Sequence, residues 1–200
     1  MKKLILIILI SSLFIYFIYI ITDHTKLNIL SIGDLYSNGY NDGFYPSYND
    51  YFKDYLKKFD NYDVLALNNT TELFDFINDN NELNNKHIKK IIKDSNLIII
   101  NTGIQELNSV DNNVNSNYIN NYLSTYEKLI NVIYKLNHNL LIVNLPKDLK
   151  ISNKYRLIIN DYYDGLANKY HINIIDIRNE DIKNTNLVIY QALINQKLTS

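Results

Sequence analysis

The chain has 200 residues, with 20 basic and 21 acidic side chains and a net charge of −1, and no basic patch or tail is evident in it. This balance argues against a nucleic-acid-binding protein, because that class concentrates positive charge on one surface. The sequence has no cysteine, which excludes disulfides, thiol catalysis and cysteine-ligated metal.

The first 24 residues predict a membrane anchor. Leu4–Ile21 carries no charge, and as a helix it would be roughly 27 Å long, close to the hydrocarbon thickness of a bilayer. Lys2 and Lys3 precede it, so the positive-inside rule keeps the N-terminus in the cytoplasm and places residues 25–200 outside. A cleaved signal peptide is the alternative, but no Ala-x-Ala site ends the segment. We therefore expect a single-pass protein of the cell membrane.

Strand-like and helix-like segments alternate after the anchor. Five apolar runs predict strands, namely Leu27–Ile32, Tyr62–Leu67, Asn96–Asn101, Leu140–Asn144 and Ile172–Ile177. Segments with helical periodicity or composition predict helices at Tyr48–Phe59, Thr71–Asn78, His87–Lys93, Tyr118–Leu136, Asn153–Tyr170 and Leu187–Leu198.

Strands of continuous Ile, Leu and Val, separated by helices, indicate a parallel sheet covered on both faces. The expected fold is therefore an α/β domain at residues 25–200, with a three-layer, doubly wound, mostly parallel five-stranded sheet. Ligands of such folds bind outside the carboxyl ends of the strands. Residues that directly follow a strand are thus the candidates for a functional site.

The turn after the first strand carries the most informative motif. Its sequence, Gly33-Asp34-Leu35-Tyr36-Ser37-Asn38-Gly39, resembles the first block of the SGNH/GDSL hydrolases, Gly-Asp-Ser-x-Thr-x-Gly. Both glycines and Asp34 match, but Leu35 stands where the family has its nucleophilic serine. The resemblance covers about residues 27–177 and implies an esterase-type fold without its nucleophile.

The resemblance also implies a Gly after strand two, an Asn after strand three and an Asp-x-x-His near the C-terminus. In active relatives the serine attacks an ester, N–H donors stabilise the oxyanion, and the histidine takes the serine proton. Here Asn69 stands in place of the Gly. The third block keeps Gly103 but has Gln105 for Asn and Glu106 for Asp. The segment Asp176–Asp181 leads to the C-terminus with no histidine.

Other residues could in principle replace the lost groups. His24 lies beside the membrane segment, and His87 starts a helix. His138 and His171 precede strands, at the end of the sheet opposite the site. Ser37 is the nearest hydroxyl to the missing nucleophile, but serine at such a position commonly caps a turn or a helix.

Nucleophile, base and two oxyanion elements differ together, which indicates that the hydrolytic chemistry is not in use. We expect no catalytic residue, cofactor or metal. Asp34 is expected to tie its turn, and Glu106 to accept hydrogen bonds at a helix start. The tyrosine-rich segment Tyr40–Tyr55 is expected to serve packing, or else to line a ligand pocket.

Three hypotheses follow. The first is an anchored, extracytoplasmic domain without hydrolase activity, which binds the membrane through Leu4–Ile21 and takes an acyl, glycan or cell-envelope ligand. The second is a divergent esterase or acyl transferase that uses Ser37. The third is a flavodoxin-like interaction module. No Gly-rich phosphate loop supports a nucleotide, because Gly33 and Gly39 are too far apart for one. The sequence names no protein partner.

Overall fold

The computed structural model describes residues 28–33, 62–66, 77, 83–110 and 114–195. Within them lies a parallel five-stranded sheet with the order β2-β1-β3-β4-β5. This confirms the α/β class with a parallel sheet. The strands are β1 (Ile29–Gly33), β2 (Tyr62–Ala66), β3 (Leu97–Asn101), β4 (Leu140–Val143) and β5 (Asn173–Ile175).

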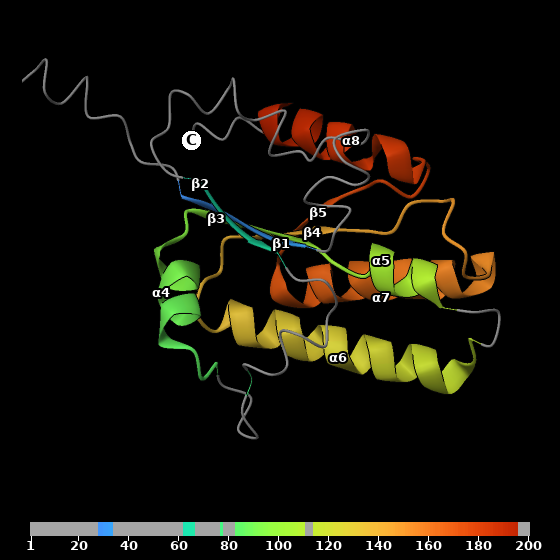
Figure 1. Cartoon of the computed structure of the whole chain (residues 1–200), viewed down its shortest axis with the longest axis horizontal. Helices are drawn as coiled ribbons and strands as arrows, with labels where there is room; N and C mark the ends of the chain where they lie inside the picture. Colours follow the sequence, from blue (N-terminus) through green and yellow to red (C-terminus); the bar gives the residue numbers. More distant parts are fainter. Residues whose placement is uncertain (1–27, 34–61, 67–76, 78–82, 111–113, 196–200) are drawn as a thin grey trace, which may run out of the picture.

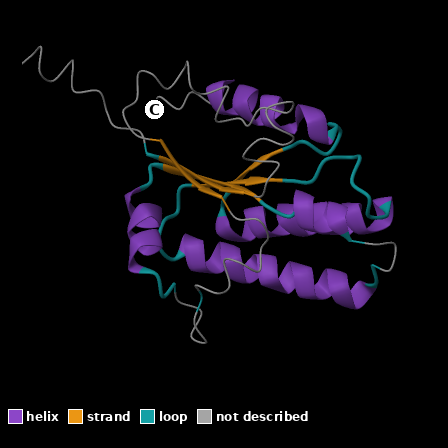
Figure 2. Cartoon of the chain, viewed as in Figure 1, coloured by secondary structure: helices purple, strands orange, loops and turns teal. Residues whose placement is uncertain are grey.

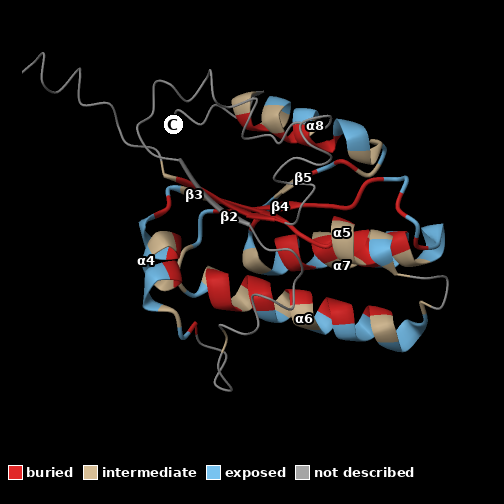
Figure 3. Ribbon diagram, in the orientation of Figure 1, coloured by how far each residue is buried: buried red, intermediate tan, exposed pale blue. Residues whose placement is uncertain are grey.

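Helices cover both faces of the sheet (Figures 1 and 2). One face carries α4 (Lys86–Asp94), α5 (Ile104–Ser109), α6 (Ser116–Tyr134) and α7 (Asn153–Tyr170), and the other carries α8 (Ile182–Asn195). Side chains alternate between the faces of a strand. Accordingly, Ile98 and Ile100 of β3 join the core under α4–α7, whereas Ile99 packs in the core with Ile189 and Leu193 of α8. Figure 3 shows the sheet buried between these layers.

Helix boundaries follow from local capping in two cases. The structure places α7 at the predicted residues 153–170, where the Ser152 hydroxyl accepts a hydrogen bond from Tyr155 N. The α6 helix begins two residues before the predicted start, because the Asn115 side chain accepts a hydrogen bond from Tyr118 N. Both caps satisfy backbone N–H groups that have no partner within the first turn.

Two predictions need correction, and one helix was not predicted. Ile77, placed in a helix by the sequence pattern, instead forms an isolated antiparallel bridge with Leu83. The last helix begins at Ile182 rather than at Leu187, because Asp148 of a distant loop accepts a hydrogen bond from Ile182 N at 2.8 Å. The short helix α5 was not predicted at all, since six residues carry too little periodicity to recognise.

Two further predicted segments lie outside the described residues. These are the helix at Tyr48–Phe59 and the anchor at Leu4–Ile21. Among the residues that the structure describes, no helix has the length and apolar character needed to cross a membrane.

Candidate functional site

The first and third motifs follow neighbouring strands at the same edge of the sheet. Gly33, the last residue of β1, lies opposite Asn101, the last residue of β3, in the parallel register. The carboxyl ends of these two strands therefore lie side by side. Asp34, Leu35, Ser37 and Asn69 lie outside the described residues, so the structure places only Gly103, Gln105 and Glu106 among the candidate site residues.

Gly103 makes the turn from β3 into α5. Its φ of 101° and ψ of −14° lie in a region that favours glycine. The hydroxyl of Tyr122 occupies the place where a Cβ of residue 103 would be. That hydroxyl shares a hydrogen bond of 2.5 Å with the hydroxyl of Tyr163. Backbone conformation and close packing thus both require glycine at the start of α5.

Gln105 and Glu106 lie half-buried in the first turn of α5. The Tyr118 hydroxyl of α6 donates a hydrogen bond to Glu106 Oε1 at 3.4 Å. Burial raises the pKa of Tyr118 to about 12, and the charge and hydrogen bond of Glu106 add to this rise. Glu106, a residue of the third motif, therefore links α5 to α6 through a hydrogen bond from Tyr118.

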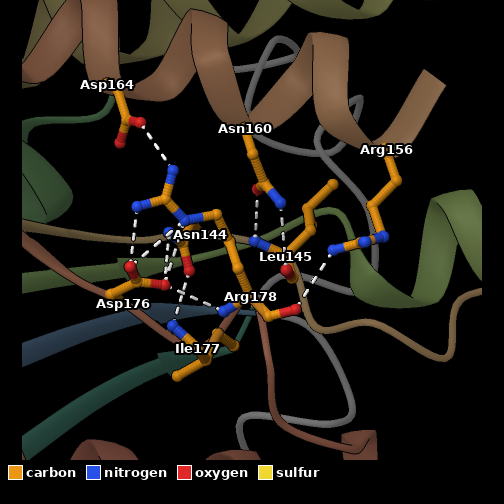
Figure 4. Close-up of polar contacts among 8 residues, drawn as sticks. All are labelled: Asn144, Leu145, Arg156, Asn160, Asp164, Asp176, Ile177 and Arg178. Atoms are coloured by element: carbon orange, nitrogen blue, oxygen red, sulfur yellow. Dashed lines mark hydrogen bonds and ion pairs between the residues drawn. The ribbon is translucent and has the colours of Figure 1, made fainter. Parts of the chain in front are cut away.

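The loops after β4 and β5 are joined by Asn144 (Figure 4). Asn144 is fully buried. Its amide oxygen accepts a hydrogen bond from Ile177 N at 2.7 Å, and its amide nitrogen donates one to Asp176 at 3.2 Å. One side chain thus fixes the backbone that leaves β5 against the end of β4.

Arg178 completes this arrangement by contacting two carboxylates. Its Nε and Nη2 atoms donate to Asp176, the latter at 2.7 Å, and Nη1 donates to Asp164 of α7 at 2.9 Å. Hydrogen bonding by Arg178 lowers the pKa of Asp176 to about 2. The planar guanidinium suits this paired geometry better than an ammonium group would.

The same two loops are also tied to α7. Asn160 donates to the carbonyl of Leu145 and accepts from its N–H at 2.7 Å, and Arg156 Nη1 donates to the carbonyl of Arg178 at 3.2 Å. Arg156 and Arg178 are the only arginines in the sequence. Both arginines therefore hold the loop after β5, where Asn144, Asp176 and Arg178 form one polar node.

Direct contacts between the two loops add to these ties. Lys147 N donates to the carbonyl of Glu180 at 2.9 Å, and Lys147 Nζ lies 3.2 Å from Asp181. His138 and His171 each lie two residues before β4 and β5, at the opposite end of the sheet, as predicted. The described residues contain no group of three or more His, Asp or Glu side chains able to hold a metal ion.

Sequence reasoning missed the residues that build this node. Asn144 lies more than thirty positions before Asp176 and Arg178 in the chain, and no local periodicity connects them. The one available signal was composition. The sequence has only two arginines beside 18 lysines, so each arginine stands out as a residue with a specific role.

Of the comparisons with known proteins, only the one with solved structures finds matches. No protein-family model matches the sequence. No curated protein matches it either. Among solved structures, a lipase from a goat rumen metagenome has a TM-score of 0.56 and 14% identity, over 86% of this chain and 97% of that chain.

A lipase/acylhydrolase from Enterococcus faecalis has a TM-score of 0.56 and 12% identity, over 85% of this chain and 96% of that one. An acetylxylan esterase from Geobacillus stearothermophilus has a TM-score of 0.58 and 11% identity, over 88% and 96%. The chain thus shares the α/β fold of these lipases and esterases.

Proposed function

We propose that this protein is a membrane-anchored, extracytoplasmic domain of SGNH/GDSL-hydrolase-like fold that does not hydrolyse esters. In this proposal Leu4–Ile21 is an uncleaved anchor, and the carboxyl edge of the sheet binds an acyl or glycan component of the cell envelope. The observation that carries the proposal is the loop after β5. It is firmly held by Asn144, Arg156 and Arg178, yet it contains no histidine.

The residues after β5 offer no histidine at the spacing that the family resemblance implies. An asparagine stands three residues after Asp176 and also after Asp181, namely Asn179 and Asn184. Asn184 lies exposed in the first turn of α8, where its N–H donates to the carbonyl of Asp181 at 2.9 Å. An amide side chain cannot accept a proton near neutral pH, so it cannot serve as the general base.

The residue in the nucleophile's place supports the same conclusion. Leu35 has no hydroxyl, and a leucine can neither attack a carbonyl nor accept the acyl group. Loss of the base alone would leave a weak hydrolase, but loss of both partners removes the covalent route altogether. A fold without either group is suited to binding rather than turnover.

The test is an ester hydrolysis assay on the full chain in detergent, with short-chain aryl esters. We expect rates equal to those of buffer. Ser37→Ala is made in parallel, with Ser124→Ala, an exposed α6 serine, as the matched control. Turnover that disappears in Ser37→Ala and persists in Ser124→Ala would show that the protein is a divergent esterase, the alternative that its lipase and esterase neighbours favour.

The binding half of the proposal needs its own measurement. Thermal unfolding of the full chain is followed with a fatty acid, an acetylated xylan fragment or a soluble peptidoglycan fragment added. A ligand that binds only the folded protein raises Tm increasingly as its concentration exceeds Kd. We expect one of these classes to raise Tm, and an unchanged Tm with all three would reject an acyl or glycan ligand.

A further inference from the structure

Helix α4 concentrates positive charge that is not evident from the overall composition. Its nine residues include four lysines against one acid, Asp94. Ile88 and Ile92 are buried in the core, while three of the lysines are exposed and the fourth is half-buried. Within the described part of the chain, none of the four forms an ion pair. These residues, here called the lysine face, are Lys86, Lys89, Lys90 and Lys93.

The C-terminal end of α4 is attached to the start of β1. Asn28 Nδ2 donates to the carbonyl of Asp94 at 3.1 Å, and Asn28 N donates to Asn96 Oδ1 at 2.8 Å. Asn137, which follows α6, donates to the carbonyl of Ile92 at 2.8 Å and so fixes the helix from a second side. Figure 3 shows the exposed residues of α4 on the side turned away from the sheet.

We propose that the lysine face rests on the anionic headgroups of the membrane that holds the chain. The inference depends on the anchor of the proposed function, because only the six residues 22–27 separate Leu4–Ile21 from Asn28. A linker of that length spans at most roughly 22 Å. The amino end of β1, and α4 with it, therefore stays within reach of the bilayer surface, where anionic headgroups attract a lysine-rich helix face.

This placement also orients the domain. The strands run away from Asn28, so the edge that carries Gly103 and the loops after β4 and β5 lies at the far end of the sheet. With the lysine face on the lipid, that edge points away from the bilayer. The candidate site then faces the envelope space rather than the membrane that anchors it.

The experiment reconstitutes the full chain in nanodiscs of phosphatidylcholine, with or without phosphatidylglycerol. The sequence has no cysteine, so Asn84→Cys, at an exposed position just before α4, gives one labelling site. A fluorophore there is quenched by nitroxide-labelled headgroups only when α4 is close to the surface. We expect stronger quenching with phosphatidylglycerol, and its loss in high salt, which screens the attraction.

The matched variants remove equal charge from two places. Lys→Gln at positions 86, 89, 90 and 93 is expected to lower the ratio of docked to undocked protein by about fivefold for each lysine. Lys→Gln at the exposed positions 128, 150, 154 and 183 is expected to leave quenching unchanged. Equal quenching in both lipids, or equal effects of both variants, would overturn the docking.

Failure of the anchor gives a different result. If the full chain does not copurify with nanodiscs of either composition, the anchor is absent, and the proposed localisation and the docking both fail. If the chain enters the discs but the label is not quenched, the anchor stands and only the docking fails. If it enters them and quenching follows lipid charge, both stand.

Discussion

The hydroxyl of Tyr122 lies beside Gly103, in the space that the Cβ of any side chain there would occupy. This contact joins the middle of α6 to the turn that starts α5, and Tyr163 of α7 holds the same hydroxyl from the other side. Three elements thus meet behind the third motif. Buried tyrosines therefore help to set the conformation of that motif.

Gly103→Ala is expected to destabilise the protein by about 2–4 kcal/mol, because the new methyl group adds both backbone strain and overpacking. Urea unfolding measures the change. Tyr122→Phe alone should cost about 1 kcal/mol through the lost hydrogen bond. In the double variant the tyrosine hydroxyl no longer clashes with the new methyl group. Its loss of unfolding free energy should therefore be smaller than the sum of the losses in the two single variants. Strict additivity would contradict the contact.

Asn144→Ala is expected to lower the free energy of unfolding by about 2–3 kcal/mol, because the buried Ile177 N–H loses its acceptor. Asn168→Ala, at an exposed position of α7, is the control and should change little. Chemical denaturation of both variants checks the prediction. If both variants unfolded with the same free energy, the Asn144 amide would not be needed to hold the loops after β4 and β5 together.

Stability should fall in acid through Asp176. Its pKa is about 2 in the folded protein and 3.8 ordinarily, so its contribution is present above 3.8 and is lost as the pH falls toward 2. The side chain is 49% exposed, so solvent screening keeps this contribution small. In Arg178→Gln, the urea midpoint should depend less on pH over this range. In Lys154→Gln, it should change with pH as steeply as in the parent protein.

Glu106→Gln is expected to lower the pKa of Tyr118 from about 12, while burial, the largest cause, keeps it above 10. Tyrosine-selective carbon-13 NMR follows the titration. Glu127→Gln is the matched control, because Glu127 contributes in the same way to raising the pKa of Tyr162 to about 12. Each substitution should shift its own tyrosine only, and a shift of both would reject the two local pairs.

Leu35→Ser is expected to leave the protein without measurable ester hydrolysis. The new serine would have the position of the family's nucleophile but no histidine after β5 to accept its proton. The aryl ester assay described above measures this, with the parent chain beside it. Hydrolysis gained by Leu35→Ser alone would reveal a base that neither sequence nor structure identifies.

The elements that the sequence predicts well are determined by residues within them or directly beside them. The run Leu97-Ile98-Ile99-Ile100 predicts a strand because it is continuously apolar, and α7 has its own serine cap. By contrast, α5 depends on the positive φ of Gly103 and on packing against Tyr122, which no local pattern reveals. The start of α8 was misplaced for a similar reason, because its N-terminal partner comes from another loop.

The residues of the candidate site also fall into a part that local motifs predict and a part that they do not. Motif order predicts that Gly103, Gln105 and Glu106 follow β3 at the carboxyl edge, and the structure places them there. The Asn144–Asp176–Arg178 node could not be predicted, because its members meet only when β4 and β5 pair. Long-range pairing of this kind leaves no periodic trace in a single sequence.

The bond from Ile182 N to Asp148, 34 residues earlier, has a consequence for the order in which the chain assembles. A short isolated helix is marginal in water, and α8 lacks this N-terminal partner until the loop after β4 is in place. The C-terminal helix is therefore expected to form last, after β4 and β5 have paired. During the proposed export, α8 would close the second face of the sheet only once the rest of the domain had left the membrane.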